Sequence, residues 1–442
     1  MTFHSTIRSL IPLPVSRTYH FALAKMAAVW YRYPSEQLRV IGVTGTNGKT
    51  STVQFIAQIL EMCGYRTGYV TTAGFSFGGN RIENRLKMTM PGRWYLEAQL
   101  RKMVEHDCRY AIVETSSQGI AQYRHLGINY DTAVFTNLTP EHVEAHGGFD
   151  HYRRAKGLLF SHLVSKSTKI FDGQEVEKTI IVNDDDPHAE YFARFPSDRT
   201  IRFGWGPECP SRDRLVAHYT ANTVKKTEIE INGVLMKIPM RASYQHRNIL
   251  AAVSTVYAQG IPLTEIAEAV SKLQPIPGRF EIIEGSQPFT VMIDYAYEPY
   301  ALRALFEAVH MFHPRRLIGV HGSAGGGRDQ ARRLEIGKCA AENESVVIVT
   351  NEDPYDDNPR EIMEAVAEGA KLKGKKVGKN LFLVNDRIEA IEKAIELGRS
   401  GDHILVTGKG SEPVMAVAHG KKIPWSDRDA VENALTHRGY GN

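Results

Sequence analysis

The sequence predicts an α/β protein with two units, a P-loop-type central ATPase domain with a mainly parallel sheet and a C-terminal Rossmann-like domain. Strand-like and helix-like segments alternate from residue 39 almost to the C-terminus, which is typical of parallel sheets covered by helices. A glycine loop followed by Lys-Thr joins the first strand to the first helix, and a segment rich in proline, 274–279, divides the series. We therefore expect an N-terminal segment at 1–38, the ATP-binding domain at 39–276 and the second domain at 277–442.

The first series supplies the elements of the central domain. We expect strands at 39–44, 68–72, 109–114, 132–136 and 179–183. Helices are expected at 49–62, 93–106, 151–165 and 247–259. The stretch 200–240 contains Asn232-Gly233 between two strand-like runs, which indicates a β-hairpin inserted into this domain.

The second series predicts another doubly wound sheet. We expect strands at 290–294, 316–320, 345–350, 380–384 and 403–407. Helices are expected at 299–311, 329–342, 359–372, 386–398 and 427–437. Ligands in such sheets bind beyond the carboxyl ends of the strands, so a site is expected at the loops 294–299, 321–328, 350–358 and 408–412.

Composition excludes several classes of protein. The 442 residues carry a net charge of +4, and five basic residues against one acidic residue at 1–40 account for all of it. The remaining chain has no basic excess, so we expect no nucleic-acid partner. No apolar run is long enough for a membrane span. The four cysteines are far apart, which argues against a disulfide framework or a paired-cysteine metal site and favours the cytoplasm.

The acid-poor N-terminal segment is open to two interpretations. An organellar transit peptide is one, and a short helix that docks on the central domain is the other. We favour the docking helix, because Pro12, Pro14 and the apolar run up to Tyr31 are typical of packed structure.

The loop between the first strand and the first helix has the features of a phosphate-binding site. Gly45 and Gly48 let the backbone approach an anion closely, and the helix N-terminus directs N–H groups toward it. Lys49 adds a positive charge, and the Thr50 hydroxyl is suited to hold Mg²⁺. The general P-loop pattern has a glycine where this chain has Val43. The alternative interpretation is a glycine turn without a ligand.

Polar residues follow two other predicted strands. Glu114 ends the strand 109–114, and a carboxylate beside a phosphate loop is a natural Mg²⁺ ligand. Glu141 and His142 follow the strand 132–136 and add oxygen and imidazole ligands at the neighbouring strand end. Lys156 lies on the predicted helix 151–165, where the residues alone indicate an exposed lysine.

The combination of these motifs resembles a known family. The matching segments, in order, are 45–50, 114–118, Gln122, Arg124, 135–138, His142, Ala155-Lys156, 248–252, Gly278-Arg279, 294–296, 328–329, 386–387, 408–412 and 426–428. Together they resemble the Mur ligases, and most closely the MurE type, which adds the third residue of the peptidoglycan stem peptide. The resemblance extends over residues 39–442.

The resemblance implies a reaction and its cofactors. ATP phosphorylates an acceptor carboxylate, and the amine of an amino acid then attacks the acyl phosphate to form an amide. The ATP-binding positions are Gly45, Thr46, Asn47, Gly48, Lys49, Thr50, Ser51, Asn248, Arg279 and Asp294. Two Mg²⁺ ions are implied, held by Thr50, Glu114, His142 and Lys156, the last as a carbamate formed with CO₂. Lys49, Glu114, His142 and Lys156 are thus the implied catalytic residues.

The resemblance also assigns the other substrates. The acceptor-facing positions are Thr89, Pro91, Ser116, Ser117, Gln122 and Arg124. The implied amino-acid-binding positions are Arg328, Asp353, Tyr355, Gly408 and Glu412, with Arg328 and Glu412 holding the α-carboxylate and the amino group. The partners are therefore a small-molecule or peptide acceptor and an amino acid.

Four departures from the family pattern limit the assignment. Some 38 residues stand where the family has a uridine-nucleotide-binding domain, so we expect residues 1–38 to dock on the central domain instead. Tyr297 replaces a histidine, and Gln245 alters the motif before Asn248. Tyr355 replaces the arginine that pairs with the distal carboxylate of meso-diaminopimelate. Because this loop is acidic, we expect a basic amino acid, lysine first.

Two other functions stay open. The same fold serves folate polyglutamylation and the synthesis of cyanophycin-like or poly-glutamate polymers, although the 116–124 segment argues against folate. A nucleotide-binding regulatory or scaffold protein without turnover is the other, but it would be expected to have lost some of Lys49, Glu114, His142 and Lys156.

Overall fold

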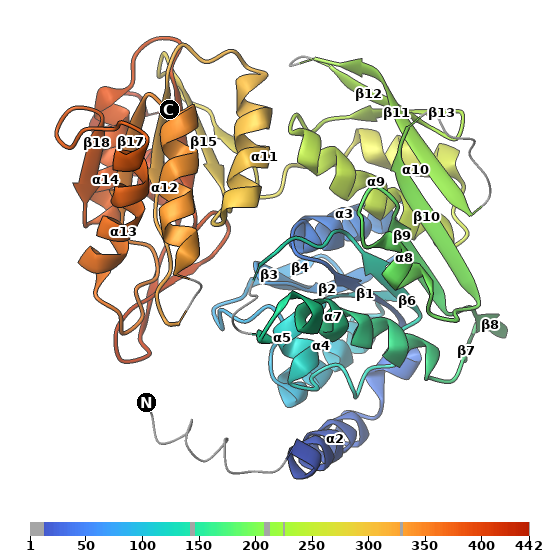
Figure 1. Cartoon of the computed structure of the whole chain (residues 1–442). Helices are drawn as coiled ribbons and strands as arrows, with labels where there is room; N and C mark the ends of the chain where they lie inside the picture. Colours follow the sequence, from blue (N-terminus) through green and yellow to red (C-terminus); the bar gives the residue numbers. More distant parts are fainter. Residues whose placement is uncertain (1–12, 142–145, 207–212, 224–225, 328–329, 442) are drawn as a thin grey trace.

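The computed structural model describes residues 13–141, 146–206, 213–223, 226–327 and 330–441, with only the backbone described at 13–18. These residues form two lobes and a projecting N-terminal helix (Figure 1). The first lobe is built on an 11-stranded sheet and the second on a 6-stranded sheet. The predicted α/β class is confirmed.

The sheet of the first lobe has the strand order β13-β12-β11-β10-β9-β6-β1-β5-β2-β3-β4. Its strands are β1 (Arg39–Thr44), β2 (Thr67–Val70), β3 (Gly74–Phe77), β4 (Asn80–Glu83), β5 (Tyr110–Glu114), β6 (Thr132–Phe135), β9 (Thr179–Asn183), β10 (Arg199–Trp205), β11 (Arg214–Asn222), β12 (Thr227–Ile231) and β13 (Val234–Ile238). The strands from β11 to β2 are parallel, and an antiparallel pair extends each edge. The parallel strands bring β1, β5 and β6 together at the centre, so the loops that follow them meet at one edge.

Both faces of this sheet are covered by helices. Ile41 and Val43 of β1 belong to the apolar core under α3 (Lys49–Met62), α9 (Ser243–Ala258) and α10 (Leu263–Ser271). Val40, on the opposite face, packs in the core under α4 (Arg93–Glu105), α7 (Phe149–Val164) and α8 (Ala189–Ala193). A strand that is buried on both faces has apolar residues at every position. The segment 40–43 of β1 accordingly contains no charged residue.

The second lobe is a doubly wound sheet with the order β14-β15-β19-β16-β17-β18. Its strands are β14 (Glu281–Ile283), β15 (Thr290–Asp294), β16 (Leu317–His321), β17 (Val346–Thr350), β18 (Leu381–Val384) and β19 (His403–Thr407). The helices α11 (Pro299–His310), α12 (Ala331–Asn343) and α13 (Pro359–Leu372) cover one face, and α14 (Arg387–Leu397) and α15 (Asp427–His437) cover the other. All its pairs are parallel except β14–β15.

Two short hairpins and a short helix complete the described elements. The hairpins are β7 (Lys169–Phe171) with β8 (Gln174–Val176), and β20 (Val414–Ala416) with β21 (Lys422–Pro424). The helix α5 (Ser117–Ala121) follows β5.

The structure differs from the sequence-based expectation at 200–240. The turn at Asn232-Gly233 does join two antiparallel strands, β12 and β13. These strands are not an inserted hairpin, however, because β10 and β11 continue the parallel sheet and carry them as its edge. Asn232 also accepts a hydrogen bond from the Val216 backbone N–H at 2.9 Å, which ties the turn to β11.

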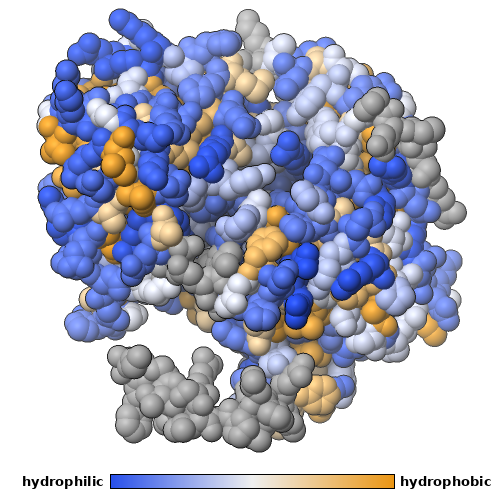
Figure 2. Space-filling view, viewed as in Figure 1, coloured by the Kyte–Doolittle hydropathy of each residue, from blue (hydrophilic) through white to orange (hydrophobic). Residues whose placement is uncertain are grey.

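The N-terminal helix α2 (Leu13–Trp30) rests on the first lobe. Its described part packs against α4, with Trp30 and Trp94 in edge contact and His20 beside Tyr123. Its outer face exposes large side chains, among them Trp30 and Tyr19. The face of the molecule in Figure 2 is otherwise mostly hydrophilic, with hydrophobic groups in small patches. Within the described residues, we find no helix with the length and hydropathy needed to cross a membrane.

Candidate active site

The phosphate loop joins β1 to α3 with two strained glycines. Gly48 has φ of +81° and directly precedes the helix, and a Cβ there would collide with the Asn248 side chain. A Cβ at Gly45 would collide with Thr136. The Lys49 ammonium donates to the Thr46 carbonyl at 2.8 Å and lies on the cavity wall. Neighbouring side chains therefore require glycine at both positions, and the loop presents a helix N-terminus and a cation, which suit phosphate binding.

The loop is fixed in place by the segment after β6. The Asn47 backbone N–H donates to the Asn137 side chain at 2.8 Å, and the Thr136 hydroxyl donates to the Asn47 carbonyl at 2.8 Å. Thr46 shares a hydrogen bond of 3.1 Å with the Tyr152 hydroxyl. These contacts fix the backbone of the loop through its own neighbours in the first lobe.

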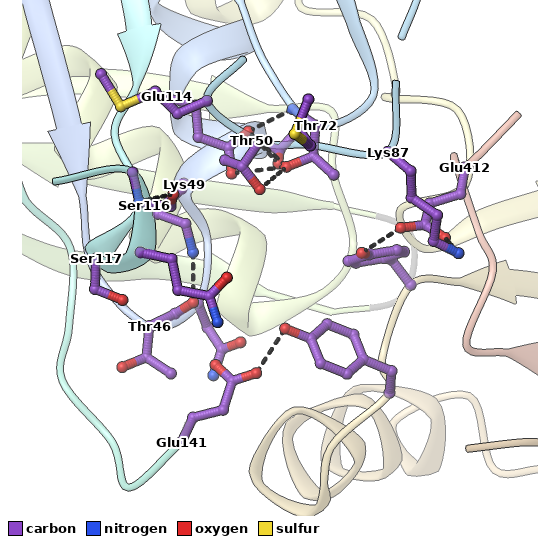
Figure 3. Close-up of a pocket in the computed structure, with 18 of the residues that line it drawn as sticks. Thr46, Lys49, Thr50, Thr72, Lys87, Glu114, Ser116, Ser117, Glu141 and Glu412 are labelled. Atoms are coloured by element: carbon purple, nitrogen blue, oxygen red, sulfur yellow. Dashed lines mark hydrogen bonds and ion pairs between the residues drawn. The ribbon is translucent and has the colours of Figure 1, made fainter. Parts of the chain in front are cut away.

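Glu114 and Thr50 form an oxygen-rich corner beside this loop (Figure 3). The Thr50 hydroxyl donates to the Glu114 carboxylate at 2.9 Å, and the Thr72 backbone N–H donates to the same oxygen at 2.8 Å. Both residues line the cavity. A hydroxyl and a carboxylate side by side are the ligands that Mg²⁺ prefers next to phosphates, so this donor set fits the ion. Within the described residues, no group of three His, Cys, Asp or Glu side chains is arranged so that it could hold a metal ion.

Lys156 is not the exposed lysine that the residues alone indicate, because its side chain is fully buried. Its ammonium donates to the Gly45 carbonyl at 2.6 Å and lies 4.4 Å from the centre of the Tyr152 ring. Burial, with a further contribution from the Lys49 charge, holds the Lys156 pKa well below its usual value. A buried lysine amine thus faces the phosphate loop and the cavity.

The three predicted nucleotide-contacting residues outside the loop lie in different settings. Asn248 lies against Gly48, outside the cavity wall. Arg279 lines the cavity with its guanidinium stacked 4.1 Å from the centre of the Tyr295 ring. Asp294 is buried and accepts from the Tyr244 hydroxyl at 2.8 Å and from the Phe280 and Ala296 backbone N–H groups. Burial raises the Asp294 pKa.

The predicted acceptor residues form another wall of the same cavity. Ser116 caps α5 by accepting from the Gly119 backbone N–H at 3.2 Å. Arg124 donates to the Gln122 side chain at 2.6 Å and to the Met90 carbonyl. The lining residues on this side are Thr89, Ser116, Ser117, Gln122 and Arg124, whereas Pro91 is buried behind them.

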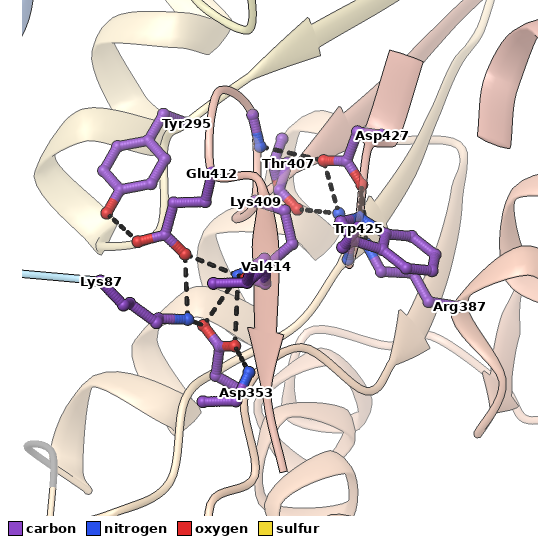
Figure 4. Close-up of polar contacts among 12 residues, drawn as sticks. Lys87, Tyr295, Asp353, Arg387, Thr407, Lys409, Glu412, Val414, Trp425 and Asp427 are labelled. Atoms are coloured by element: carbon purple, nitrogen blue, oxygen red, sulfur yellow. Dashed lines mark hydrogen bonds and ion pairs between the residues drawn. The ribbon is translucent and has the colours of Figure 1, made fainter. Parts of the chain in front are cut away.

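A compact cluster of charges forms the end of the cavity in the second lobe (Figure 4). Lys409 is completely buried and donates to Asp353 at 3.1 Å, to Glu412 at 2.6 Å and to the Val414 carbonyl at 2.7 Å. Lys87 reaches the same two carboxylates from the first lobe, with 3.0 Å between its ammonium and Glu412. Although burial alone would raise it, the Glu412 pKa falls to about 2, because both lysines stabilise the carboxylate.

The two lobes also meet through uncharged donors. The Tyr297 hydroxyl donates to Glu141 at 2.6 Å, and the Asn47 side chain donates to Glu298 at 3.0 Å. Tyr297 is the residue that departs from the family pattern, and its hydroxyl reaches across the cavity to the first lobe. These bonds hold the lobes in contact around the cavity.

These walls enclose one cavity of about 280 Å³. Of the predicted site residues, it is lined by Thr46, Asn47, Gly48, Lys49, Thr50, Thr89, Glu114, Ser116, Ser117, Gln122, Arg124, Lys156, Arg279, Asp353, Gly408 and Glu412. Gly45, Ser51, Pro91, Asn248, Asp294 and Tyr355 lie outside its wall. His142 and Arg328 fall outside the described residues. All four loops expected to form a site in the second lobe contribute to the lining.

Several lining residues were not predicted from the sequence. Lys87, Thr72, Tyr152 and Tyr297 belong to this group, whereas Glu352 belongs to the acidic loop from which a basic amino acid was expected. Glu352 is buried, and one of its carboxylate oxygens has no hydrogen-bond partner. Lys87 precedes the predicted Thr89 by two residues but carries no motif. Tyr297 lies in the expected loop 294–299 and departs from the family pattern, but neither feature identified its partner Glu141.

Comparisons with known proteins agree with this geometry. The Mur ligase middle domain matches residues 43–256, and the Mur ligase, glutamate ligase domain matches residues 278–410. A UDP-N-acetylmuramyl-tripeptide synthetase of a Roseiflexus species is 34% identical over 98% of this chain and 85% of its own length. A UDP-N-acetylmuramoyl-L-alanyl-D-glutamate--2,6-diaminopimelate ligase of Geobacillus kaustophilus is 30% identical over 97% of this chain and 85% of its own length.

Solved structures share the fold. A UDP-N-acetylmuramoyl-L-alanyl-D-glutamate--2,6-diaminopimelate ligase superposes with a TM-score of 0.59 at 24% identity, covering 95% of this chain and 84% of that protein. The folylpolyglutamate synthase of Mycobacterium tuberculosis superposes with a TM-score of 0.68 at 17% identity, covering 89% and 93%. At these identities the likeness concerns the fold alone.

Proposed function

This chain belongs to the Mur ligase family of ATP-dependent, ADP-forming amide ligases, and from that premise we propose that it adds one amino acid to a peptide acceptor resembling a peptidoglycan precursor. The observation that carries the proposal is the shared cavity. One space connects the phosphate loop, the Ser116–Arg124 wall and the charged cluster around Glu412. A ligase needs these three places to be adjacent, because a phosphoryl group, a carboxylate and an amine must meet.

The residues of this chain supply binding and orientation for the two steps. A carboxylate is a poor electrophile, so the acceptor oxygen first attacks the γ-phosphorus of ATP, and ADP leaves. The amine nitrogen then attacks the acyl carbon, and phosphate departs with the carboxylate oxygen. Lys49 and the N-terminus of α3 stabilise the charge on the transferred phosphoryl group. Arg124, with Ser116 and Ser117, is placed to hold the acceptor.

Thr50 and Glu114 are the residues suited to hold Mg²⁺. When bound, the ion neutralises negative charge on the phosphates. Glu114 accepts hydrogen bonds from Thr50 and Thr72, and these contacts orient its carboxylate. His142 belongs to the predicted ligand set by family resemblance.

Lys156 is proposed to act as a carbamate. Addition of CO₂ to the neutral amine forms a C–N bond, releases one proton and turns an uncharged side chain into an anionic oxygen ligand. Its position supports this role, because the amine is buried against Gly45 and faces the cavity near Glu114. A permanent ammonium at this place would repel a metal ion.

The incoming amino acid is proposed to be basic, with lysine first. The loop 351–357 contains four acidic residues, Glu352, Asp353, Asp356 and Asp357, but most of them already have protein partners. Asp353 is paired with lysines, Asp356 accepts from the His419 backbone, and Asp357 lies 3.5 Å from Arg333. Support for a cationic side chain therefore rests on Glu352, which lines the cavity and has one buried carboxylate oxygen without a hydrogen-bond partner. The relatives named as diaminopimelate ligases make meso-diaminopimelate the main competitor.

Mass spectrometry of reaction products tests the proposal. The protein is incubated with ATP, Mg²⁺, a panel of acceptors and equal concentrations of lysine, ornithine, meso-diaminopimelate and glutamate. The acceptor panel includes UDP-N-acetylmuramoyl-dipeptide, the free peptide and a folate. We expect a product heavier than a peptide acceptor by one amino acid less water, with equimolar ADP. Ligation to folate alone, or ATP hydrolysis without any amide product, would refute it.

A further inference from the structure

We infer that Lys87 occupies the subsite for the ammonium group of the incoming amino acid, so that the amino acid binds by displacing it. This inference rests on the proposed function. Lys87 belongs to the first lobe, in the segment between β4 and α4, whereas both its carboxylate partners belong to the second lobe. Figure 4 shows its side chain entering the charged cluster between Asp353 and Glu412.

The contacts of Lys87 are those that a free amino group would make. Its ammonium lies 3.0 Å from Glu412 and also contacts Asp353, and its side chain is only 8% exposed. An α-ammonium has the same charge and the same three N–H donors. Two buried carboxylates separated by one ammonium are therefore a ready site for either group.

The charge balance leaves room for one cation besides Lys409. Lys409 belongs to the second lobe, is 0% exposed and has contacts with both carboxylates and the Val414 carbonyl. It therefore stays with the cluster when the lobes separate. Asp353 and Glu412 then keep one uncompensated negative charge. Lys87 neutralises it in this structure, and a single incoming ammonium would do the same.

The backbone on both sides of Lys87 is anchored by hydrogen bonds, so the Lys87 side chain can move while the segment keeps its position. Lys87 has a left-handed backbone, with φ of +54°, which is uncommon for a residue other than glycine. Its neighbours are held separately, because Lys422 donates to the Leu86 carbonyl at 2.7 Å and Asn84 donates to the Met88 carbonyl at 2.9 Å. The side chain can therefore leave the carboxylates while the backbone stays anchored.

Because Lys87 is next to residues on the acceptor side of the cavity, its position can couple acceptor binding to amino-acid binding. It lies one residue before Met88 and two before Thr89, and all three line the cavity on the acceptor side. A tethered ammonium competes at a high effective concentration, so it raises the amino-acid concentration needed for binding. We expect an acceptor that shifts the 87–89 segment to release Lys87 and so favour amino-acid binding after the acceptor.

Lysine reactivity measured by mass spectrometry tests the inference directly. The full-length protein is pulse-labelled with formaldehyde and cyanoborohydride, with and without each amino acid, and methylation is compared between Lys87, Lys409 and the exposed Lys272. Normalising to Lys272 corrects for reagent consumed by the free amino acid. We expect labelling of Lys87 to rise at least severalfold with the amino acid that is ligated, while Lys409 stays protected.

A substitution gives a second readout. Lys87→Met removes the internal competitor and should lower the amino-acid KM and the calorimetric Kd by about tenfold, within the usual range for one charged contact. Lys272→Met is the matched control, because it removes an exposed lysine of the same lobe that does not line the cavity, and we expect its amino-acid affinity to stay unchanged. Weaker amino-acid binding in Lys87→Met would overturn the inference, since Lys87 would then be part of the amino-acid site.

The outcomes separate this inference from the proposed function. Ligation without any change in Lys87 labelling would refute displacement and leave the ligase intact. Increased Lys87 labelling with an amino acid that is never ligated would support the subsite and refute the ligase. Neither ligation nor a labelling change with any amino acid would refute both.

Discussion

At the Thr50–Glu114 corner of the cavity the hydrogen bonds join residues of the first lobe, whereas at the opposite end the ion pairs join both lobes. Thr50, Thr72 and Glu114 hold one another within the first lobe. Around Glu412, Lys87 comes from the first lobe and Lys409 from the second. The Thr50–Glu114 corner therefore needs no residue of the second lobe, whereas the charged cluster combines residues of both lobes.

This difference indicates that one end of the cavity serves phosphoryl transfer, whereas the other end selects the amino acid. A preformed phosphate site suits a charge-stabilising role, because it needs no reorganisation during the reaction. A site built across two lobes can respond to its ligands, because each ligand shifts the equilibrium between closed and open forms. Substitutions at the first end should therefore abolish turnover, and those at the second should change affinity and preference.

The largest effect is expected from Lys49→Ala. Removing the cation that faces the transferred phosphoryl group should reduce ligation by about a hundredfold or more, with the fold unchanged by circular dichroism. Lys272→Ala, on the exposed surface of the same lobe, should keep full activity. Ordinary turnover by folded Lys49→Ala would show that the glycine loop is only a turn.

Loss of the buried amine should be almost as damaging, but partly reversible. Lys156→Ala removes the proposed carbamate and should be inactive, and acetate should restore part of the activity by supplying a carboxylate in the vacated space. Initial rates across an acetate series measure this, with chloride as the control salt. Full activity without acetate would contradict a role for Lys156 in the reaction.

A smaller effect is expected at the contact between the lobes. Tyr297→Phe deletes the hydroxyl that donates to Glu141, and one such bond contributes roughly 1 to 3 kcal/mol because its acceptor is a carboxylate. Small-angle scattering of the wild-type protein should show compaction with a non-hydrolysable ATP analogue plus acceptor. Tyr297→Phe should need more ligand for the same change. Identical profiles with and without bound ligand would indicate a fixed arrangement.

The smallest effect is expected from Tyr355→Arg. Tyr355 lies outside the cavity wall, with its ring 5.8 Å from the Lys87 ammonium. An arginine there can approach a distal carboxylate only from the edge, so we expect a shift of a few-fold toward meso-diaminopimelate in competition with lysine. A wild-type protein that already prefers meso-diaminopimelate would contradict the charge argument for lysine.

The same contrast explains what the sequence could predict. The phosphate loop, β1 and α3 were predictable because their signals are local: an apolar run, two glycines, Lys-Thr and an apolar helical face within 24 residues. The four site loops of the second lobe were predictable because ligands in doubly wound sheets bind beyond the carboxyl ends of the strands. Burial of Lys156 was not visible in its own helix and entered only through the family resemblance.

Lys87 and Tyr297 could not be predicted because their partners are distant in the sequence. Lys87 meets Asp353 across 266 positions, and Tyr297 meets Glu141 across 156. No periodicity or motif encodes such a pair, since it depends on how two separately folded sheets face each other. The sequence placed β12 and β13 in an inserted hairpin for a related reason. Their pairing with β11 depends on tertiary contacts that the local sequence does not specify.

Isotope transfer tests the central claim, the acyl-phosphate route, most directly. An acceptor carrying ¹⁸O in its reacting carboxylate is ligated in the presence of ATP, and the released phosphate is analysed by mass spectrometry. We predict one ¹⁸O atom in the phosphate for every amide formed, together with ADP. Unlabelled phosphate, or AMP that carries the label, would contradict the account.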